Sequence, residues 1–302
     1  MAKLITMPTT PNFVRSNFRL VRAIGAVASP YTGKIRTQEF DGVFWEASVT
    51  LPPMRRDVAL NWQSFLLELN GSVNNFKFAD PDALVKRGNY SVDALQFETR
   101  VNATNKTLTF NSTDNTILDT ATSAPFANSK VGDFIVVTGS ANSANNGTHK
   151  ITAITNTSKV VVDPIDAQTL VSETNVASCT IKDNVKGAKG INLKATSNSA
   201  SGTILKGDYL GIGTASGDSA STYIPTQYVM VTANATETDN GGSALNQYGV
   251  RIEPKLRETK SANVKVFHNP AKGLFRLAEK DVSWDADQIS NFGITFNCIE
   301  VV

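Results

Sequence analysis

The sequence has few of the residues from which metal centres, disulfide frameworks and catalytic triads are built. Its 302 residues include two cysteines and two histidines. Cys179 and Cys298 lie too far apart in the chain for a zinc motif, and two cysteines make no disulfide framework. His149 and His268 have no partner in sequence, and no G-x-S-x-G nucleophile motif accompanies them. We therefore predict no catalytic residue, no metal and no cofactor.

A strong charge of one sign and a long apolar run are also missing. Lysine and arginine total 29 against 27 acidic residues, for a net charge of +2, and the longest basic run is the pair Arg55 and Arg56. A dedicated nucleic-acid-binding protein carries a clustered basic excess, so we expect no nucleic-acid partner. The start of the chain lacks the apolar segment of a signal peptide, and no segment approaches the about 18 apolar residues of a membrane helix. We expect a soluble protein without membrane insertion, made in a cytoplasm.

Most of the remaining sequence alternates with the period of two that is typical of half-buried strands. In residues 42–51 one face is apolar, and its members are Val43, Trp45, Ala47, Val49 and Leu51. The same pattern recurs in residues 248–254, where Val250 and Ile252 oppose Arg251 and Glu253. Residues 227–233 and 264–268 are further short β-branched runs. Cys298 alternates with polar residues in the last such run, so we expect it to point inward as a small apolar side chain.

One segment has a helical period instead. Between Pro52-Pro53 and Gly71 the apolar residues recur at three- and four-residue steps, and they are Val58, Trp62, Phe65, Leu66 and Leu69. This stripe predicts one amphipathic helix over about residues 54–70, with Asp57 in its early turn and Gly71 as its C-terminal cap. We expect Trp62 and Phe65 to pack in the core rather than to stack on a ligand.

The composition changes within the chain. Residues 99–186 contain no tryptophan and no tyrosine and are rich in Asn, Thr, Ser and Val. They contain three strand-like runs, and Asn146-Gly147 is a hairpin signal between the first two. We predict a mainly β protein. Its split barrel or sandwich core, with the one helix, is formed by residues 1–98 and 187–302, and residues 99–186 form an inserted small all-β domain.

A glycine-rich stretch at residues 206–218 resembles a nucleotide-binding loop, because Gly211, Gly213 and Gly217 are closely spaced. A dinucleotide fingerprint requires a helix that opens at the glycines, and the residues after Gly213 have no helical period. We therefore assign these glycines to a β-turn or a bulge. Gly207-Asp208 is predicted to be a tight turn into a strand, and a similar layout of Lys, Gly-Asp and aromatic residue occurs at residues 130–134.

Two pairs of carboxylates are the remaining candidates for chemistry. Asp80 and Asp82 flank Pro81, and Asp285 and Asp287 follow Trp284. Each pair has the residue types of an acid–base couple or a cation site. Because both pairs lie in short polar segments, we interpret them as solvated turn residues.

The order of motifs in the last third of the chain resembles that of distal tail proteins, the ring-forming baseplate components of long-tailed, siphovirus-like bacteriophages. The matching segments are Gly207-Asp208, Gly241-Gly242, Ile252–Arg257, Gly273–Leu277, Trp284 and Phe296–Glu300. The strand that leads into Pro52-Pro53, the Trp-containing helix and the F-x-F-x-D-P motif at residues 76–81 are similar to the N-terminal part of the same family. The resemblance covers about residues 1–98 and 187–302. Residues 99–186 depart from the family pattern.

This resemblance implies a structural virion protein rather than an enzyme. It implies a hexameric ring at the distal end of a phage tail, assembled in the bacterial host cytoplasm. The implied partners are copies of the chain itself, the tail tube protein, the baseplate hub, and tail fibre or receptor-binding proteins.

Two hypotheses from other classes stay open at this point. The chain could be a carbohydrate-binding or adhesin module of the tail tip, in which the insert contacts the host surface and Phe126 or Phe134 stacks on a sugar. It could also be a hydrolase of cell-surface polymer that uses one of the aspartate pairs.

Overall fold

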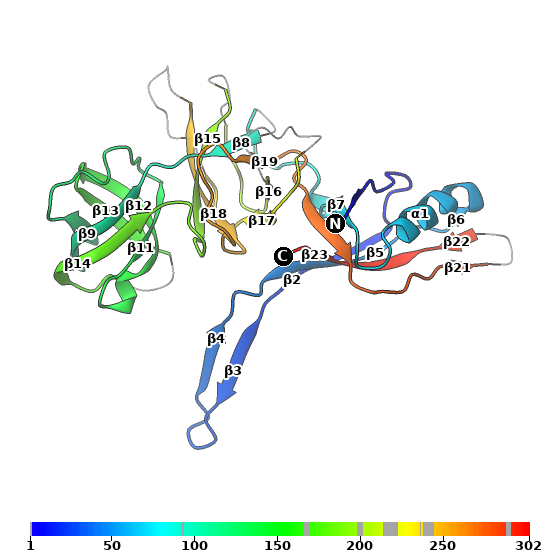
Figure 1. Ribbon diagram of the computed structural model, residues 1–302, viewed down its shortest axis with the longest axis horizontal. Helices are drawn as coiled ribbons and strands as arrows, with labels where there is room; N and C mark the ends of the chain where they lie inside the picture. Colours follow the sequence, from blue (N-terminus) through cyan, green and yellow to red (C-terminus); the bar gives the residue numbers. More distant parts are fainter. Residues whose placement is uncertain are drawn as a thin grey trace. The chain divides into compact units, whose positions relative to one another are not determined.

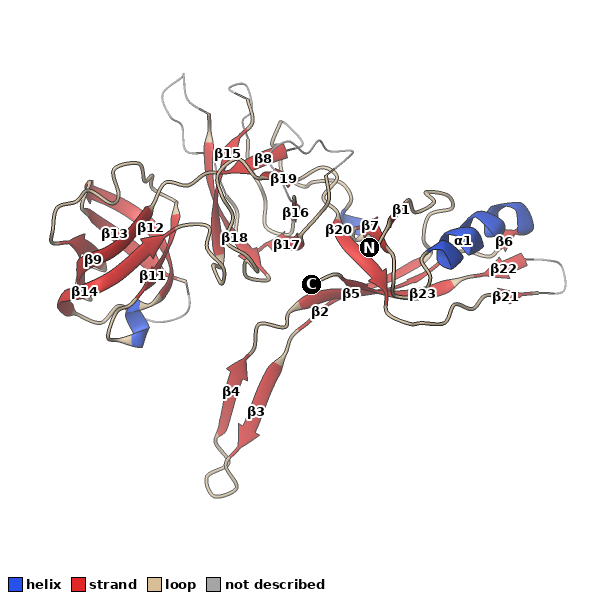
Figure 2. Ribbon diagram, in the orientation of Figure 1, coloured by secondary structure: helices blue, strands red, loops and turns tan. Residues whose placement is uncertain are grey.

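The computed structural model describes residues 2–91, 94–165, 169–197, 202–213, 223–235, 237, 245–287 and 291–302. These residues form a mainly β protein with a single α-helix among them, which confirms the predicted fold class (Figures 1 and 2). They group into two compact units. The first contains Met1–Val85, Ile224–Tyr228 and Ala271–Val302, and the second contains Lys86–Tyr223 and Val229–Pro270.

The first unit is built on a six-stranded sheet with the order β1-β7-β20-β23-β5-β2. The strands of this sheet are β1 (Leu4–Ile5), β2 (Arg15–Val21), β5 (Phe44–Thr50), β7 (Asn75–Phe78), β20 (Gly273–Leu277) and β23 (Thr295–Glu300). Strand β5 pairs antiparallel with both β2 and β23. Its predicted alternation is confirmed, because the apolar face is buried and the intervening residues are half-buried. Cys298 is fully buried in β23, also as predicted.

The predicted helix is α1 (Arg56–Glu68), and its start differs from the expectation. Met54 and Arg55 form the short strand β6 (Met54–Arg55), which pairs with β22 (Asn291–Gly293) and so cannot be helical. The apolar stripe is buried as predicted except for Val58, which is half-buried, and Trp62 and Phe65 are in edge-on contact at 5.9 Å between ring centroids. The C-terminal cap is Leu69 rather than the predicted Gly71, which lies two residues further on and follows Asn70 in the left-handed region, with φ +50° at Asn70 and φ +61° at Gly71. Strand β21 (Asp285–Ala286) completes the small sheet.

A two-stranded ribbon continues from β2 and β5 beyond the sheet. It consists of β3 (Ile24–Ala28) and β4 (Ile35–Glu39), which pair only with each other among the described residues. Figure 1 shows this ribbon extending away from the sheet and from α1. We call residues 24–40 the arm.

The second unit is built of two closed six-stranded barrels, except that the first two residues of one strand, Gln227 and Tyr228, are grouped with the first unit. The first barrel consists of β9 (Asn102–Asn111), β10 (Thr116–Asp119), β11 (Phe134–Thr138), β12 (Gly147–Asn156), β13 (Lys159–Pro164) and β14 (Glu173–Lys182). The second consists of β8 (Ala94–Phe97), β15 (Gly190–Ala195), β16 (Tyr209–Ile212), β17 (Gln227–Val231), β18 (Gln247–Glu253) and β19 (Lys265–Phe267). Two short 3-10 helices, Pro81–Ala83 in the first unit and Ser143–Asn145 in the second, complete the described elements.

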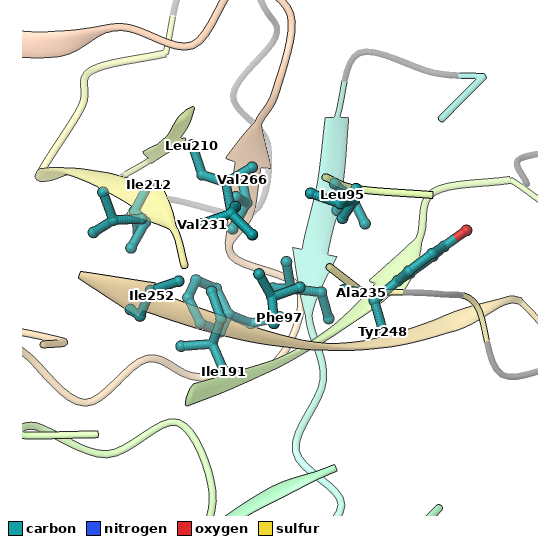
Figure 3. Close-up of a cluster of buried hydrophobic side chains, with 14 of the residues drawn as sticks. Leu95, Phe97, Ile191, Leu210, Ile212, Val231, Ala235, Tyr248, Ile252 and Val266 are labelled. Atoms are coloured by element: carbon teal, nitrogen blue, oxygen red, sulfur yellow. The ribbon is translucent and has the colours of Figure 1, made fainter. Parts of the chain in front are cut away.

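The two barrels have the same topology. The neighbours run β10-β13-β12-β11-β14-β9 in the first barrel and β15-β18-β17-β16-β19-β8 in the second. When the six strands of each barrel are numbered in chain order, both circles read 2-5-4-3-6-1. Each barrel encloses its own apolar core, and Figure 3 shows the side chains of the second barrel converging from its strands. The chain therefore contains the same barrel plan twice.

The predicted insert at residues 99–186 contains every strand of the first barrel, β9 to β14. The predicted core segments 1–98 and 187–302 each contribute strands to both compact units, and the divisions between these units fall at Val85/Lys86, Tyr223/Ile224, Tyr228/Val229 and Pro270/Ala271. The insert as an independent domain with boundaries at 98/99 and 186/187 stays a prediction.

Two turn predictions need correction. Strands β11 and β12 do form a hairpin, but Gly147 is already the first residue of β12 and the loop covers residues 139–146. The Asn146 side chain joins the two ends of this loop. It accepts a hydrogen bond from the Ser140 N–H and donates one to the Ser140 carbonyl. Gly211 lies inside β16, paired with Phe267, and is not part of a turn. Gly217 lies outside the described residues.

Close backbone approach at Gly249 leads to a stability prediction. A Cβ atom at this position would overlap the carbonyl oxygen of Gly132 and approach the Phe134 ring. We expect Gly249→Ala to lower the free energy of unfolding by about 2 kcal/mol, because the backbone must shift to admit the methyl group. Urea denaturation measures this change. Gly293→Ala is the matched control, since a Cβ there meets nothing within 4 Å. Equal stability of the two variants would contradict the prediction.

Candidate functional site

The arm is the strongest candidate for an interaction surface. It carries five of the seventeen exposed large hydrophobic side chains among the described residues: Ile24, Val27, Tyr31, Ile35 and Phe40. Tyr31 at the tip is 96% exposed and Val27 is 72% exposed. Proteins seldom gather apolar side chains on an exposed element unless a partner covers them.

Both faces of the arm are open. The register pairs Ile24 with Glu39 and Ala28 with Ile35, which places these side chains on one face, while Val27 pairs with Arg36 on the other. All residues of β4 are exposed. An isolated two-stranded ribbon is marginally stable in water, because neither face is buried against a third element. The arm therefore offers two open faces to a partner surface.

The interpretation of the carboxylate pairs as solvated turn residues holds only in part, because Asp80 is half-buried and Asp285 lies in the exposed strand β21. Asp80 caps the 3-10 helix Pro81–Ala83 by accepting from the Asp82 N–H at 3.2 Å. Asp82 is exposed and lines a cavity of about 370 Å³ whose wall also includes Phe13 and Trp62. Asp287 accepts from the Asn291 backbone N–H at 2.7 Å. Neither pair is joined by further acidic or histidine ligands, since no metal-holding cluster occurs among the described residues.

Both histidines are buried, and the fold gives each a partner that the sequence did not indicate. His149 Nε2 lies 3.0 Å from the Asn145 carbonyl oxygen. His268 Nε2 lies 3.3 Å from Asp208 Oδ2, although the two residues are 60 positions apart. No sequence signal marks this pair, because β16 and β19 become neighbours only when the second barrel closes.

The Gly-Asp turn before β16 is confirmed and is organised by the Asp208 carboxylate. Gly207 has φ +92°. The carboxylate accepts from the backbone N–H groups of Leu205 at 2.8 Å, Arg87 at 2.6 Å and Gly88 at 3.2 Å. Burial by itself raises the pKa of Asp208, but the hydrogen bonds from His268, Arg87 and Leu205 outweigh it and lower the pKa to about 2. These contacts indicate a structural carboxylate rather than a proton-transfer group.

The similar layout at residues 130–134 forms the same turn before β11, the equivalent strand of the first barrel. Gly132 has φ +99°, and Asp133 accepts from the Lys130 N–H at 2.8 Å, as Asp208 does from the residue three positions before it. Asp133 is buried and ion-paired with Arg100. Here burial dominates and raises the pKa of Asp133 to about 6, with Arg100 acting in the opposite direction.

The sugar-stacking candidates of the insert are not available to a ligand. Phe126 is 1% exposed and Phe134 is 3% exposed. Phe126 belongs to the core of the first barrel, and the Phe134 ring packs closely against Gly190. The hypothesis that either side chain stacks on a sugar is therefore wrong, because both are covered by protein.

Several residues of the family resemblance occupy defined elements. The segment Gly273–Leu277 is β20, Phe296–Glu300 lies within β23, and Trp284 is 37% exposed. The buried Glu300 carboxylate accepts from the Tyr228 N–H at 2.8 Å and the Trp45 N–H at 3.2 Å. Gly241-Gly242 lies outside the described residues.

Comparison with protein-family models and with curated proteins finds no match for this chain. Among the residues that the structure describes, no helix is long and apolar enough to cross a membrane. The arm had one sequence signal, the turn residues Pro30 and Gly33 between the apolar run at residues 24–28 and the mostly polar segment at residues 35–39.

Asp208 leads to a pH prediction. Its folded pKa of about 2 lies below the ordinary value of 3.8, so its charged form adds stability above about pH 4 that is lost as the pH falls toward 2. We expect Asp208→Asn to lower the free energy of unfolding by about 2 kcal/mol at pH 7 and to flatten the dependence between pH 4 and 2. Urea titrations at several pH values measure both effects. The exposed control Asp285→Asn should match the wild type, and a wild-type profile for Asp208→Asn would contradict the prediction.

Asp133 leads to a prediction of opposite sign. Its folded pKa of about 6 lies above the ordinary 3.8, so its contribution to stability falls as the pH rises from about 4 to 6. Asn imitates the protonated side chain, so we expect the stability of Asp133→Asn relative to the wild type to increase across this interval. The same urea titrations give this difference. A difference that stays constant between pH 4 and 6 would show that Asp133 is already charged throughout.

Proposed function

We propose that this chain is a structural protein of a bacteriophage tail. Copies of it form a ring, sixfold in our proposal, at the distal end of the tail. The ring links the tail tube to the baseplate hub and to the host-binding fibres or receptor-binding proteins. The chain acts in the assembled virion after synthesis in the bacterial host, and the proposal assigns it no catalytic role.

The observation that carries this proposal is the arm. An exposed ribbon with apolar side chains on both faces is stabilised when another protein covers it. Copies of the same chain are always available at the place of assembly. A contact between an arm and a different surface of the next copy is heterologous, and repeated heterologous contacts close into a ring when the rotation between copies allows it.

Two further features support the same class of function. The ordered series of turn and strand motifs resembles that of ring-forming tail proteins, and many of those residues serve packing or turns in the fold. The near balance of charge, with a net charge of +2, permits many copies to lie side by side without strong repulsion. These are properties of a scaffold subunit.

The test is the state of assembly of the purified protein. Light scattering should give a species at a multiple of 32.4 kDa, and negative-stain images should show a ring with a central hole. A variant with Ile24→Thr, Val27→Thr, Tyr31→Ser and Ile35→Thr should be monomeric, because the apolar side chains that a neighbour would cover are gone. Threonine keeps a high strand propensity, so the ribbon itself is retained.

The matched control is Val131→Thr with Val171→Thr, which replaces two exposed valines of the second unit. This control should form the same ring as the wild type. A wild-type protein that stays monomeric at all concentrations would contradict self-assembly. An arm variant that still forms rings would show that the arm does not carry the contact.

A further inference from the structure

The chain crosses between the two barrels twice, and the two crossings are hydrogen-bonded to each other. Residues 98–101 lead from β8 to β9, and residues 183–189 lead from β14 to β15. The Asp183 backbone N–H donates to the Val101 carbonyl at 3.1 Å. We call these two crossings the neck. Every covalent connection between the barrels therefore passes through the neck.

Each barrel encloses a core of its own, and the described contacts between the barrels join their surfaces. Asn192 of β15 accepts from the Phe134 N–H at 2.8 Å and donates to the Phe134 carbonyl at 2.9 Å. The Phe134 ring lies against Gly190, and Val136 packs against the core of the second barrel. The position of the first barrel on the second is therefore set by surface contacts that can separate while both cores stay folded.

Arg100 of the neck is the centre of a buried charge cluster. Its guanidinium donates to the Glu98 carboxylate at 2.9 Å, to the Asp133 carboxylate, and to the Leu193 carbonyl at 3.1 Å. The side chains of Arg100 and Asp133 are 2% and 3% exposed. Glu98 belongs to the neck, Asp133 to the turn before β11 of the first barrel, and Leu193 to β15 of the second. One arginine thus joins the neck to both barrels.

Carboxylates outnumber cations among the described residues of this cluster. Asp183 supplies a third carboxylate, which accepts from the Arg100 backbone N–H at 2.7 Å. The second cation is Lys194, whose Nζ lies 3.6 Å from Glu98. Three carboxylates against two cations give a net charge of −1 when every group is ionised. A buried net charge is costly, so the cluster favours the uptake of one proton.

Two observations assign this proton to the aspartates of the cluster. Asp183 Oδ1 is buried and has no hydrogen-bond partner among the described residues, so a negative charge on this oxygen is uncompensated. Burial raises the pKa of Asp183, and it raises the pKa of Asp133 to about 6. Arg100 and the Lys130 N–H act against the rise at Asp133, whereas Asp183 and Glu98 add to it. These four groups, from the neck and from the turn itself, are the ones that face Asp133 in the described structure.

We propose that the neck is a proton-controlled hinge between the barrels. While the cluster holds one proton, the first barrel stays fixed on the second, as in the structure. When a carboxyl group of the cluster loses this proton to water, separation of the charged groups relieves the net negative charge, and the first barrel turns about the neck. The inference concerns the second unit alone and does not depend on the proposed ring.

The direction of the pH effect follows from the state that binds the proton more tightly. In the closed state the pKa of Asp133 is about 6, and in an open state exposed to water this pKa returns toward the ordinary 3.8. The closed state is therefore favoured at low pH and loses this advantage as the pH rises from about 4 to 6. The ratio of open to closed molecules can rise about a hundredfold at most over this interval, and we expect at least about tenfold.

Distances between two spin labels measure the movement. Thr113→Cys places a label on the turn between β9 and β10 of the first barrel, and Lys206→Cys places one before β16 of the second. Both positions are exposed, whereas the native Cys179 and Cys298 are buried and stay unlabelled. Pulsed electron paramagnetic resonance on the full chain should give one narrow distance distribution at pH 4.5. At pH 7.5 a second population at other distances should appear.

Hydrogen exchange measures the size of the effect even where the open state is rare. The Phe134 N–H is hydrogen-bonded across the barrels to Asn192, so separation of the barrels exposes it to water. Its protection factor, which corrects for the intrinsic effect of pH on exchange, should fall at least about tenfold from pH 4.5 to pH 7.5. The control is the Val162 N–H, which donates to the Asn115 carbonyl within the first barrel and should keep its protection.

The variant Asp133→Asn tests the cluster itself. It leaves two carboxylates against two cations, so the cluster is neutral at both pH values without taking up a proton. We expect one narrow distance distribution and the same Phe134 protection at pH 4.5 and at pH 7.5. The matched control is Asp163→Asn, which removes an exposed carboxylate of the same barrel and should follow the wild type.

Circular dichroism at each pH separates a hinge motion from the unfolding of a barrel. Unchanged spectra together with pH-dependent distances are the expected result. A wild-type chain with the same distances and protection at both pH values would overturn the hinge. So would an Asp133→Asn variant that keeps the wild-type pH response, because the proton would then act elsewhere. A loss of strand signal that accompanies the new distances at pH 7.5 would overturn it as well, since a barrel would then unfold rather than turn.

Discussion

The pairing of β5 on both of its edges is the constraint on which the first unit depends. Hydrogen bonds to β2 and β23 fix the strand, and its apolar face is buried. The chain enters β5 from the arm and leaves it toward β6 and α1. A single strand thus connects the arm to the part of the unit that carries the helix. The arm is exposed because, among the described residues, no third strand pairs with β3 or β4.

The second unit shows how one local motif takes on different chemistry in two places. Gly132-Asp133 and Gly207-Asp208 form the same turn before the third strand of barrels with the same strand order. In each, glycine supplies the positive φ and aspartate accepts the N–H group three residues earlier. The pKa of Asp133 is raised and that of Asp208 is lowered, because burial dominates at the first and hydrogen bonds at the second. The turn is formed by the local sequence, whereas the pKa of its aspartate depends on the groups that the fold packs around the carboxylate.

Much of the secondary structure could be predicted from periodicity. The alternation in β5 and β18 and the helical stripe of α1 depend only on residues that are close in the sequence. They can therefore be recognised without knowing the fold. The errors occur where pairing with a distant strand determines the secondary structure of a residue. Met54 and Arg55 are drawn from the helix into β6 by pairing with β22, and Gly211 is held in β16 by pairing with Phe267. The position of the loop before Gly147 depends likewise on where β11 and β12 stop pairing.

The sequence by itself determined the strand-rich class, the single helix with its buried face, the inward position of Cys298 and the two Gly-Asp turns. Each of these follows from spacing over a few residues or from the conformational freedom of glycine. The tertiary structure decided the common topology of the barrels, the burial of Phe126 and Phe134, the meeting of Asp208 with His268, and the exposure of the arm. These depend on contacts between residues far apart in the chain, and no local pattern encodes which distant strands will become neighbours.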